Sequence, residues 1–315
     1  ENIKIKSDLN KEWVSDMKAK LGIAPIAWSN DDLPELGGET SLETCLSEAR
    51  KAGFTGIETG GKFPKEPRDL ELALNDHDIS LCGGWYSGTL LDNDLEIEKQ
   101  KVRNQLDLFT HLQAPCLVYG ETSGTIQNIR NAPLSSRRIL NEEEFKPYGE
   151  KLTLFAEWCE HEGMPIAFHH HMGTAVETER DLDLLMKNSD DAVSLLYDPG
   201  HMAFANGNVY EIIERHGHRI SHFHAKDVRI NVVSELRRDS ESFLDAVLKG
   251  AFTVPGDGSL NFDQLVQQLM SIKYEGWFVV EAEQDPKLAP PFEFACKGYA
   301  SLSKSLSKAG YKIIA

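Results

Sequence analysis

The chain has 315 residues, 41% of them hydrophobic, which is enough for one large domain or two ordinary ones. Its formal net charge of −17 argues against nucleic acid or an anionic membrane surface as the main partner. The five cysteines are scattered and form no CxxC pair, as is typical of reduced thiols in a cytoplasmic protein. No apolar run approaches the ~20 residues that span a bilayer, and residues 1–20 are predicted as a polar N-terminal extension.

Short apolar runs alternate with helical segments along the first half of the chain. The predicted strands are residues 21–27, 54–58, 79–85 and 114–120. The predicted helices are residues 40–52, 68–75, 96–112 and 142–162. Gly53 and Gly163 follow two of these helices, as C-capping glycines do, and Asn141 with Glu144 forms a capping box before the longest one.

The same alternation continues to the C-terminus. The next predicted strand lies within residues 165–174, PIAFHHHMGT, and carries the histidines. The strands after it are residues 193–198, 220–224 and 277–281. The predicted helices are residues 178–187, 209–216, 262–272 and 291–308, and an irregular insertion spans 227–255. Eight strand–helix units without a linker predict a parallel sheet, and fit a single-domain (β/α)8 TIM barrel. A doubly wound open sheet is the alternative, although no G-x-G-x-x-G follows the first strand.

Barrel enzymes carry their chemistry at the carboxyl ends of the strands. The predicted strand ends here hold residues that bind metals or transfer protons: Glu58, Glu121, His169, His170, His171, Asp198, His201, His222, His224, Lys226, Glu281 and Glu283. Taken singly, each has a plain structural alternative, such as an exposed turn or a packed core histidine. Their co-location at successive strand ends predicts one metal site.

Strand periodicity selects a ligand set. Alternate residues of a strand share a face, so His169 and His171 should face the site and His170 the barrel wall. One ligand from each of the last four strands gives His169, Asp198, His224 and Glu281. Two imidazoles and two carboxylates suit Mn²⁺, Co²⁺, Zn²⁺ or Fe²⁺ better than Ca²⁺. Without a thiolate, a closed structural zinc site is not expected.

Other residues near these strand ends have candidate roles. Lys226 follows His224 by two residues. A nearby cation would lower the pKa of Lys226, so that this residue could act as a general acid or base. The alternative is a surface lysine paired with Asp227. Trp28 and Trp85, with Tyr86, lie in early strand-end segments and could stack on a ring, or belong to the core.

Several motifs together resemble a known family. YDPGH, HFHAKD and VVEAE resemble the xylose-isomerase-like barrel superfamily of sugar isomerases, epimerases and endonucleases. From residue 21 onward, GIAPIAWSNDDLPELGGE, GFTGIETGGKFP, FHHHMGT, VPGDG and GWFVVEAEQDP resemble the inosose dehydratase family of myo-inositol catabolism within it. This resemblance implies a cytoplasmic lyase that converts a small cyclitol ketone, 2-keto-myo-inositol, to a trihydroxycyclohexane-dione with Mn²⁺ or Co²⁺.

The resemblance carries over residue by residue. The superfamily aspartate and its partner histidine fall on Asp198 and His201, and the later histidine and glutamate fall on His224 and Glu281. Most superfamily members have a metal-binding glutamate where this chain has His169, so the ligand on the fifth strand is left open between His169 and the nearby His171.

The remaining site residues are assigned from the expected chemistry. Removal of a proton α to the keto group needs a base near the cation, for which we expect His201 or Lys226. Glu58 and His171 are expected as further catalytic contacts. The expected substrate contacts are Trp28, Trp85, Glu121 and His222. A sugar isomerase or epimerase and a non-catalytic cyclitol-binding protein are the alternatives, and the sequence leaves homo-oligomerisation open.

Overall fold

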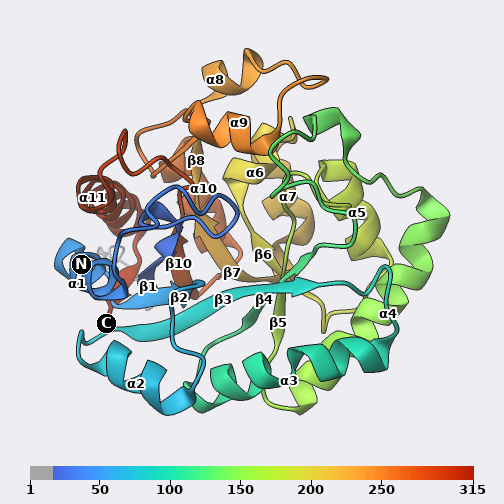
Figure 1. Cartoon of the computed structure of the whole chain (residues 1–315), viewed down its shortest axis with the longest axis horizontal. Helices are drawn as coiled ribbons and strands as arrows, with labels where there is room; N and C mark the ends of the chain where they lie inside the picture. Colours follow the sequence, from blue (N-terminus) through green and yellow to red (C-terminus); the bar gives the residue numbers. More distant parts are fainter. Residues whose placement is uncertain (1–16) are drawn as a thin grey trace, which may run out of the picture.

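The computed structural model describes residues 17–315, and its centre is a closed barrel of eight parallel strands (Figure 1). In order these are β1 (Lys18–Ile23), β2 (Gly56–Thr59), β3 (Ser80–Gly88), β4 (Leu117–Glu121), β5 (Ile166–His169), β6 (Ser194–Tyr197), β7 (Ile220–Ala225) and β10 (Gly276–Val280). Pairing of β10 with β1 closes the sheet, so the predicted barrel is confirmed and the open sheet was wrong. The predicted N-terminal extension lies outside the described residues up to residue 16, and Lys18 already belongs to β1.

A ring of helices covers the outside of the barrel (Figure 1). These are α1 (Leu42–Ala52), α2 (Pro67–Asn75), α3 (Leu95–His111), α4 (Glu142–His161), α5 (Glu179–Lys187), α7 (Val209–His216), α10 (Phe262–Ser271) and α11 (Pro291–Ala309). Both predicted end signals are confirmed. Gly53 ends α1 in the left-handed conformation at φ 112°, and Asn141 and Glu144 form a reciprocal capping box at the start of α4.

Two regions contain structure that the sequence did not predict. Asp198 caps a short helix, α6 (Pro199–Phe204), where a plain turn was the alternative. The irregular insertion contains a two-stranded ribbon and two short helices: β8 (Asp227–Val228), α8 (Ile230–Ser234), α9 (Phe243–Leu248) and β9 (Phe252–Thr253). The remaining elements are three single-turn helices and an edge strand beside β1: η1 (Pro25–Ala27), η2 (Leu134–Ser136), η3 (Gly217–Arg219) and β11 (Lys312–Ile314).

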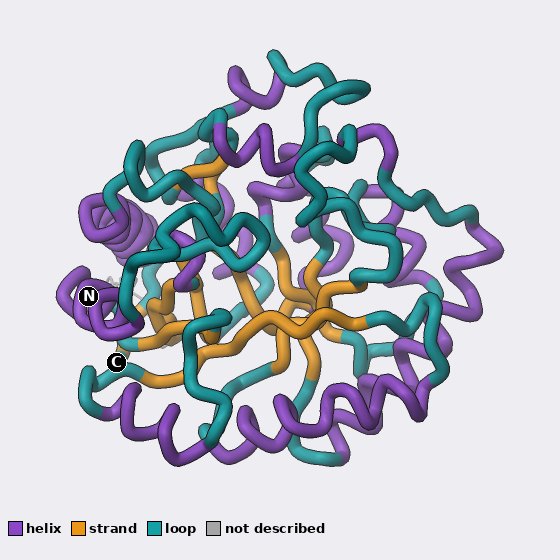
Figure 2. The backbone as a smooth tube through the Cα atoms, in the orientation of Figure 1, coloured by secondary structure: helices purple, strands orange, loops and turns teal. Residues whose placement is uncertain are grey.

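The inserted elements cover the carboxyl end of the barrel with a small apolar core of their own. Phe243 of α9 and Phe252 of β9 pack with Phe204 of α6, Met172 after β5 and Leu33 after β1. Figure 2 shows the loops and short helices gathered on this side, around α8 and α9. This cover removes water from the strand ends, where electrostatic interactions consequently become stronger.

All five cysteines are free thiols. Within residues 17–315, no helix combines the length and apolar character needed to cross a membrane.

Candidate metal centre and active site

The four predicted ligands converge at the carboxyl end of the barrel. Asp198 Oδ2 lies 3.7 Å from His169 Nε2 and 3.6 Å from His224 Nδ1, and His224 Nδ1 lies 3.6 Å from Glu281 Oε2. Bonds of about 2.0–2.2 Å to one tetrahedral ion place neighbouring ligand atoms roughly 3.3–3.6 Å apart. The spacing of the predicted ligand set therefore fits one divalent cation.

The hydrogen bonding of these side chains gives a second test of that fit. Asp198 Oδ2, His224 Nδ1 and Glu281 Oε2 are buried atoms without a hydrogen bond, although Glu281 Oε2 forms an ion pair with Lys226. Buried polar atoms are costly to leave unpaired, and coordination of a metal ion would satisfy Asp198 Oδ2 and His224 Nδ1, which have no partner as close as that ion pair. Burial, followed by the neighbouring imidazoles, lowers the pKa of His169 well below its ordinary value, which keeps this ring neutral as a ligand must be.

Hydrogen bonds to neighbouring groups orient the two imidazoles of the predicted ligand set. The Nδ1 atom of His169 bonds the carbonyl oxygen of His170, so its Nε2 lone pair faces Asp198. The Nε2 atom of His224 donates to Glu58 Oε1 at 3.0 Å, so its Nδ1 atom faces the ligand set. His222 donates to the same Glu58 oxygen at 2.9 Å. Glu58 is therefore a positioning residue in a carboxylate–histidine arrangement common behind metal ligands.

The two histidines that contact Glu58, His222 and His224, have raised pKa values. Burial alone would lower the pKa of both rings, but Cys116 and then Glu58 raise the pKa of His222 to about 9, and Glu58, Asp198 and Glu281 raise that of His224 to about 10. For His224 the largest of these contacts is with Glu58. Burial alone would raise the pKa of Glu58, and the two rings instead lower it far below its usual value. In the protein without a cation, His224 therefore holds a proton that metal binding would displace.

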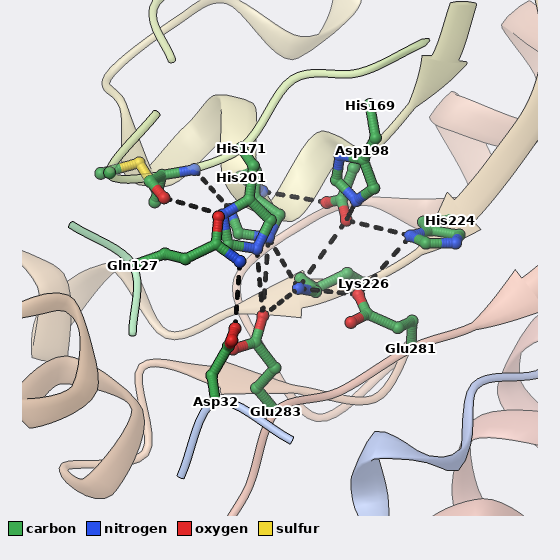
Figure 3. Close-up of polar contacts among 12 residues, drawn as sticks. Asp32, Gln127, His169, His171, Asp198, His201, His224, Lys226, Glu281 and Glu283 are labelled. Atoms are coloured by element: carbon green, nitrogen blue, oxygen red, sulfur yellow. Dashed lines mark hydrogen bonds and ion pairs between the residues drawn. The ribbon is translucent and has the colours of Figure 1, made fainter. Parts of the chain in front are cut away.

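A second cluster lies directly beside the predicted ligand set and consists of His171, His201 and Glu283. The Nε2 atoms of both histidines lie close to Glu283 Oε1, at 3.8 Å for His171 and 3.6 Å for His201. The fully buried Lys226 Nζ lies 2.8 Å from both Glu283 Oε1 and His201 Nε2. Figure 3 shows Lys226 between the second cluster and the predicted ligand set.

The neighbours of the two histidines in the second cluster favour the same tautomer, with the ring proton on Nδ1. His171 Nδ1 donates to the Met172 carbonyl oxygen at 2.7 Å, which leaves Nε2 as a free acceptor. His201 faces a donor at each nitrogen, the Met172 N–H at 3.2 Å and Lys226 at 2.8 Å. A neutral ring accepts at only one, and the shorter, charge-assisted contact with Lys226 is the stronger.

The charge of Lys226 differs from the sequence expectation. Burial would lower its pKa, but Glu281, Glu283 and Asp198 raise it above the ordinary lysine value. Its partners are these carboxylates rather than Asp227, whose side chain accepts backbone N–H groups of the 256–260 turn. Lys226 is therefore a buried ammonium group in the protein without a cation.

A cavity of about 120 Å³ opens onto the predicted ligand set. A buried cavity of roughly 150 Å³ holds benzene, so this space is of the order needed for one six-membered ring. Its walls include His169, His171, His224, Glu281 and Trp85. Both His169 and His171 thus face the site as predicted, whereas His170 points into the wall and accepts the Asp198 N–H.

Sequence reasoning missed other polar residues that line this cavity. Asp31 and Asp32 come from the loop after β1, and Gln127 comes from the loop after β4. Gln127 Nε2 donates to Asp32 Oδ2 at 3.0 Å (Figure 3). The two aspartates follow a strand end and could have been found by the rule used for the others. Gln127 lies in a long loop without any such signal.

Three predicted substrate contacts are not on the cavity wall. Trp28 packs in the core and donates its indole N–H to Glu48, as the alternative for this residue expected. Glu121 is buried and accepts from Tyr119 and Ser123. His222 lies beneath the site on Glu58.

Trp85 is the predicted aromatic that reaches the cavity, edge-on to His169 and His171 at 5.6 and 5.5 Å between ring centroids. Tyr86 alternates to the other face of β3 and donates to the buried Glu98. The two residues expected as the base, His201 and Lys226, are fully buried behind the wall, whereas His171 and Glu58 are part of it.

A model of a protein family described as xylose isomerase-like TIM barrel matches residues 46–298. The chain belongs to this family. Within the xylose isomerase-like family, it is 45% identical over 298 residues to the rhizopine catabolism protein MocC of Rhizobium meliloti, which covers 94% of this chain and 91% of that protein. It is 42% identical over 282 residues to an inosose dehydratase of Geobacillus thermodenitrificans, and the match covers 89% of this chain and 95% of that protein. The resemblance found in the motifs is confirmed.

Solved structures show the same barrel. The crystal structure of IOLI protein with a bound zinc atom matches with a TM-score of 0.64 at 17% identity. The match covers 92% of this chain and 98% of that one. At this identity the likeness concerns the fold of the xylose isomerase-like family.

Proposed function

We propose that this chain is a metal-dependent hydro-lyase that removes water from 2-keto-myo-inositol to give a trihydroxycyclohexane-dione. Relatives at 40–42% identity over about nine-tenths of the chain are named inosose dehydratase, which supports this reaction. The observation that carries the proposal is the set of four convergent ligand atoms beside a cavity sized for one ring.

The metal would be held by the predicted ligand set, His169, Asp198, His224 and Glu281. Two nitrogen and two oxygen donors without a thiolate suit Mn²⁺, Co²⁺, Zn²⁺ or Fe²⁺, and the resemblance to the inosose dehydratase family favours Mn²⁺ or Co²⁺ among these. When bound, the cation supplies Lewis-acid stabilisation of the negative charge that develops on a keto oxygen during removal of the α-proton. Glu58 holds the ring of His224 in the orientation that this coordination needs.

The α-proton would pass to His171. Its Nδ1 atom donates to the Met172 carbonyl, so in the neutral ring the lone pair is on Nε2, and this ring lines the cavity. Glu283, beside it, is held ionised because burial, which would raise its pKa, is overcome by neighbouring groups, Lys226 foremost, which lower it to about 2. An imidazolium formed on His171 is therefore stabilised by a carboxylate 3.8 Å away. This assignment replaces His201 and Lys226 as the base, because neither faces the cavity.

Hydroxyl groups of the substrate ring would bind to the polar residues of the cavity wall. Asp31, Asp32 and Gln127 offer acceptors and one amide donor there, and Trp85 offers an apolar edge. A polyhydroxylated ring donates several hydrogen bonds, and carboxylate acceptors form the stronger ones. Loss of the β-hydroxyl, with a proton, then completes the elimination of one water molecule.

The test is the fate of 2-keto-myo-inositol on incubation with the metal-loaded protein, followed by NMR. The expected product is the dione, with myo-inositol unchanged in a parallel reaction, because only the keto group makes the α-proton acidic. Formation of an isomer without loss of water would favour the isomerase or epimerase alternative. No reaction of the ketone by protein that contains the metal would contradict the proposal.

A further inference from the structure

The predicted ligand set and the second cluster are neighbouring groups with the composition of two metal sites. His169, Asp198 and His224 can each offer one ligand atom within 4.8 Å of the others, and so can His171, His201 and Glu283. Glu283 is almost fully buried, and its Oε2 atom has no hydrogen-bond partner. Such a pair of groups resembles the ligand arrangement of two-metal enzymes, in which the ions lie about 3.5–4 Å apart.

Lys226 lies where a second cation would bind. Its Nζ atom is 2.8 Å from Glu283 Oε1 and 2.8 Å from His201 Nε2, which are two atoms of the second cluster. It also lies 2.7 Å from Glu281 Oε2 and 3.8 Å from Asp198 Oδ2 in the predicted ligand set (Figure 3). The ammonium group therefore already contacts the donors that a second ion would need.

The buried charges balance with one metal ion. Within the two clusters, Asp198, Glu281 and Glu283 supply three negative charges, which one divalent cation and the ammonium group of Lys226 neutralise; Glu58 lies outside the clusters and is paired with His222 and His224. A second divalent ion beside Lys226 would leave excess positive charge in a site sheltered from water, which is strongly unfavourable.

The position of Lys226 is fixed by its surroundings. Its side chain is fully buried, and its Nζ atom lies 4.4 Å from the centroid of the Phe252 ring. Gly200 of α6 leaves room for the lysine stem, since a Cβ atom there would lie 2.6 Å from Lys226 Cγ. The ammonium group is consequently held in the second cluster rather than free to move out when a metal arrives.

We propose that the Lys226 ammonium group serves as a built-in second cation, which occupies the second cluster and limits this site to one divalent metal ion. This inference rests on the metal site of the proposed function. It predicts that removal of the charge converts the second cluster into a binding site for a second ion, with His171, His201 and Glu283 as its ligands.

The test is the number of Mn²⁺ ions bound per chain at saturation, measured by equilibrium dialysis and elemental analysis. Wild-type protein should bind one ion, and Lys226→Met should bind two. The electron paramagnetic resonance spectrum should change from that of an isolated Mn²⁺ to that of a spin-coupled pair. The double variant Lys226→Met with Glu283→Gln is the matched control and should return to one ion.

The outcomes distinguish a failure of the role of Lys226 from a failure of the proposed metal site. Wild-type protein that binds no ion would contradict the metal site itself. One ion in wild type and in a folded Lys226→Met variant would overturn the role of Lys226 and leave the metal site intact. Lys226→Gln gives a second neutral variant if circular dichroism shows that the methionine variant is unfolded. Two ions in wild type would overturn the inference without any variant.

Discussion

Replacement of Glu58 by glutamine tests how the site orients its metal ligand. The carboxylate accepts from His224 Nε2 at 3.0 Å and from His222 Nε2 at 2.9 Å, both through Oε1. A glutamine oxygen can keep both contacts and loses only the charge. Hydrogen bonds to charged groups contribute about 1.5–3 kcal/mol and neutral ones about 0.5–1.5, so each bond should weaken by about 1–2 kcal/mol. The His224 bond alone then predicts that the pH-independent Mn²⁺ affinity, obtained from titrations at several pH values to separate loss of the His224 proton, is weaker by roughly 10-fold, within the 10–100-fold range for such partners.

The assay is a competition titration of Mn²⁺ against a chelator, with kcat/KM for the ketone measured on the same samples. Glu98→Gln is the matched control, because Glu98 is also a fully buried carboxylate with a tyrosine and a threonine as partners, remote from the cavity. It should lower stability without changing metal affinity. Unchanged Mn²⁺ affinity in folded Glu58→Gln would refute the positioning role of Glu58.

Further predictions concern the metal, the histidines and the cavity wall. EDTA should abolish turnover and Mn²⁺ or Co²⁺ should restore it, whereas full turnover by rigorously metal-free protein would be incompatible with the mechanism. His169→Ala should lose the metal, whereas His171→Ala should keep it and lose at least roughly 100-fold in kcat, the usual scale for a general base; equal metal loss in both would argue against separate roles. Calorimetry in buffers of different ionisation enthalpy should show proton release on metal binding at pH 7, since His224, with a pKa of about 10, must lose its proton.

The barrel was predictable because its signal is local and repeated. Eight apolar runs separated by helical periodicity, with end signals such as Gly53 and Asn141, leave few arrangements other than a closed parallel sheet. The short elements after β7 were not predicted. α9 and β9 are stabilised by packing of Phe243 and Phe252 on distant segments, and that long-range contact leaves no periodic trace in so short a stretch.

The convergence of His169, Asp198, His224 and Glu281 was predictable for the same reason as the barrel, since alternate residues at strand ends share a face. Strand alternation also placed His170 in the wall, where it accepts the Asp198 N–H. Trp28 was a candidate only because it follows the first strand, and strand alternation gives no direction for the C-cap residue of η1, whose indole turns into the core to reach Glu48. Strand alternation also could not separate Lys226 from the cavity wall, because depth along the barrel axis is not encoded in face alternation.

The most direct measurement of the central claim is the anomalous scattering of Mn²⁺ in crystals of the metal-loaded protein. The account predicts one strong peak at about 2.0–2.2 Å from His169 Nε2, Asp198 Oδ2, His224 Nδ1 and Glu281 Oε2. A peak centred on Glu58 and His222, or the absence of a peak from this cavity in crystals that turn over the ketone, would contradict it.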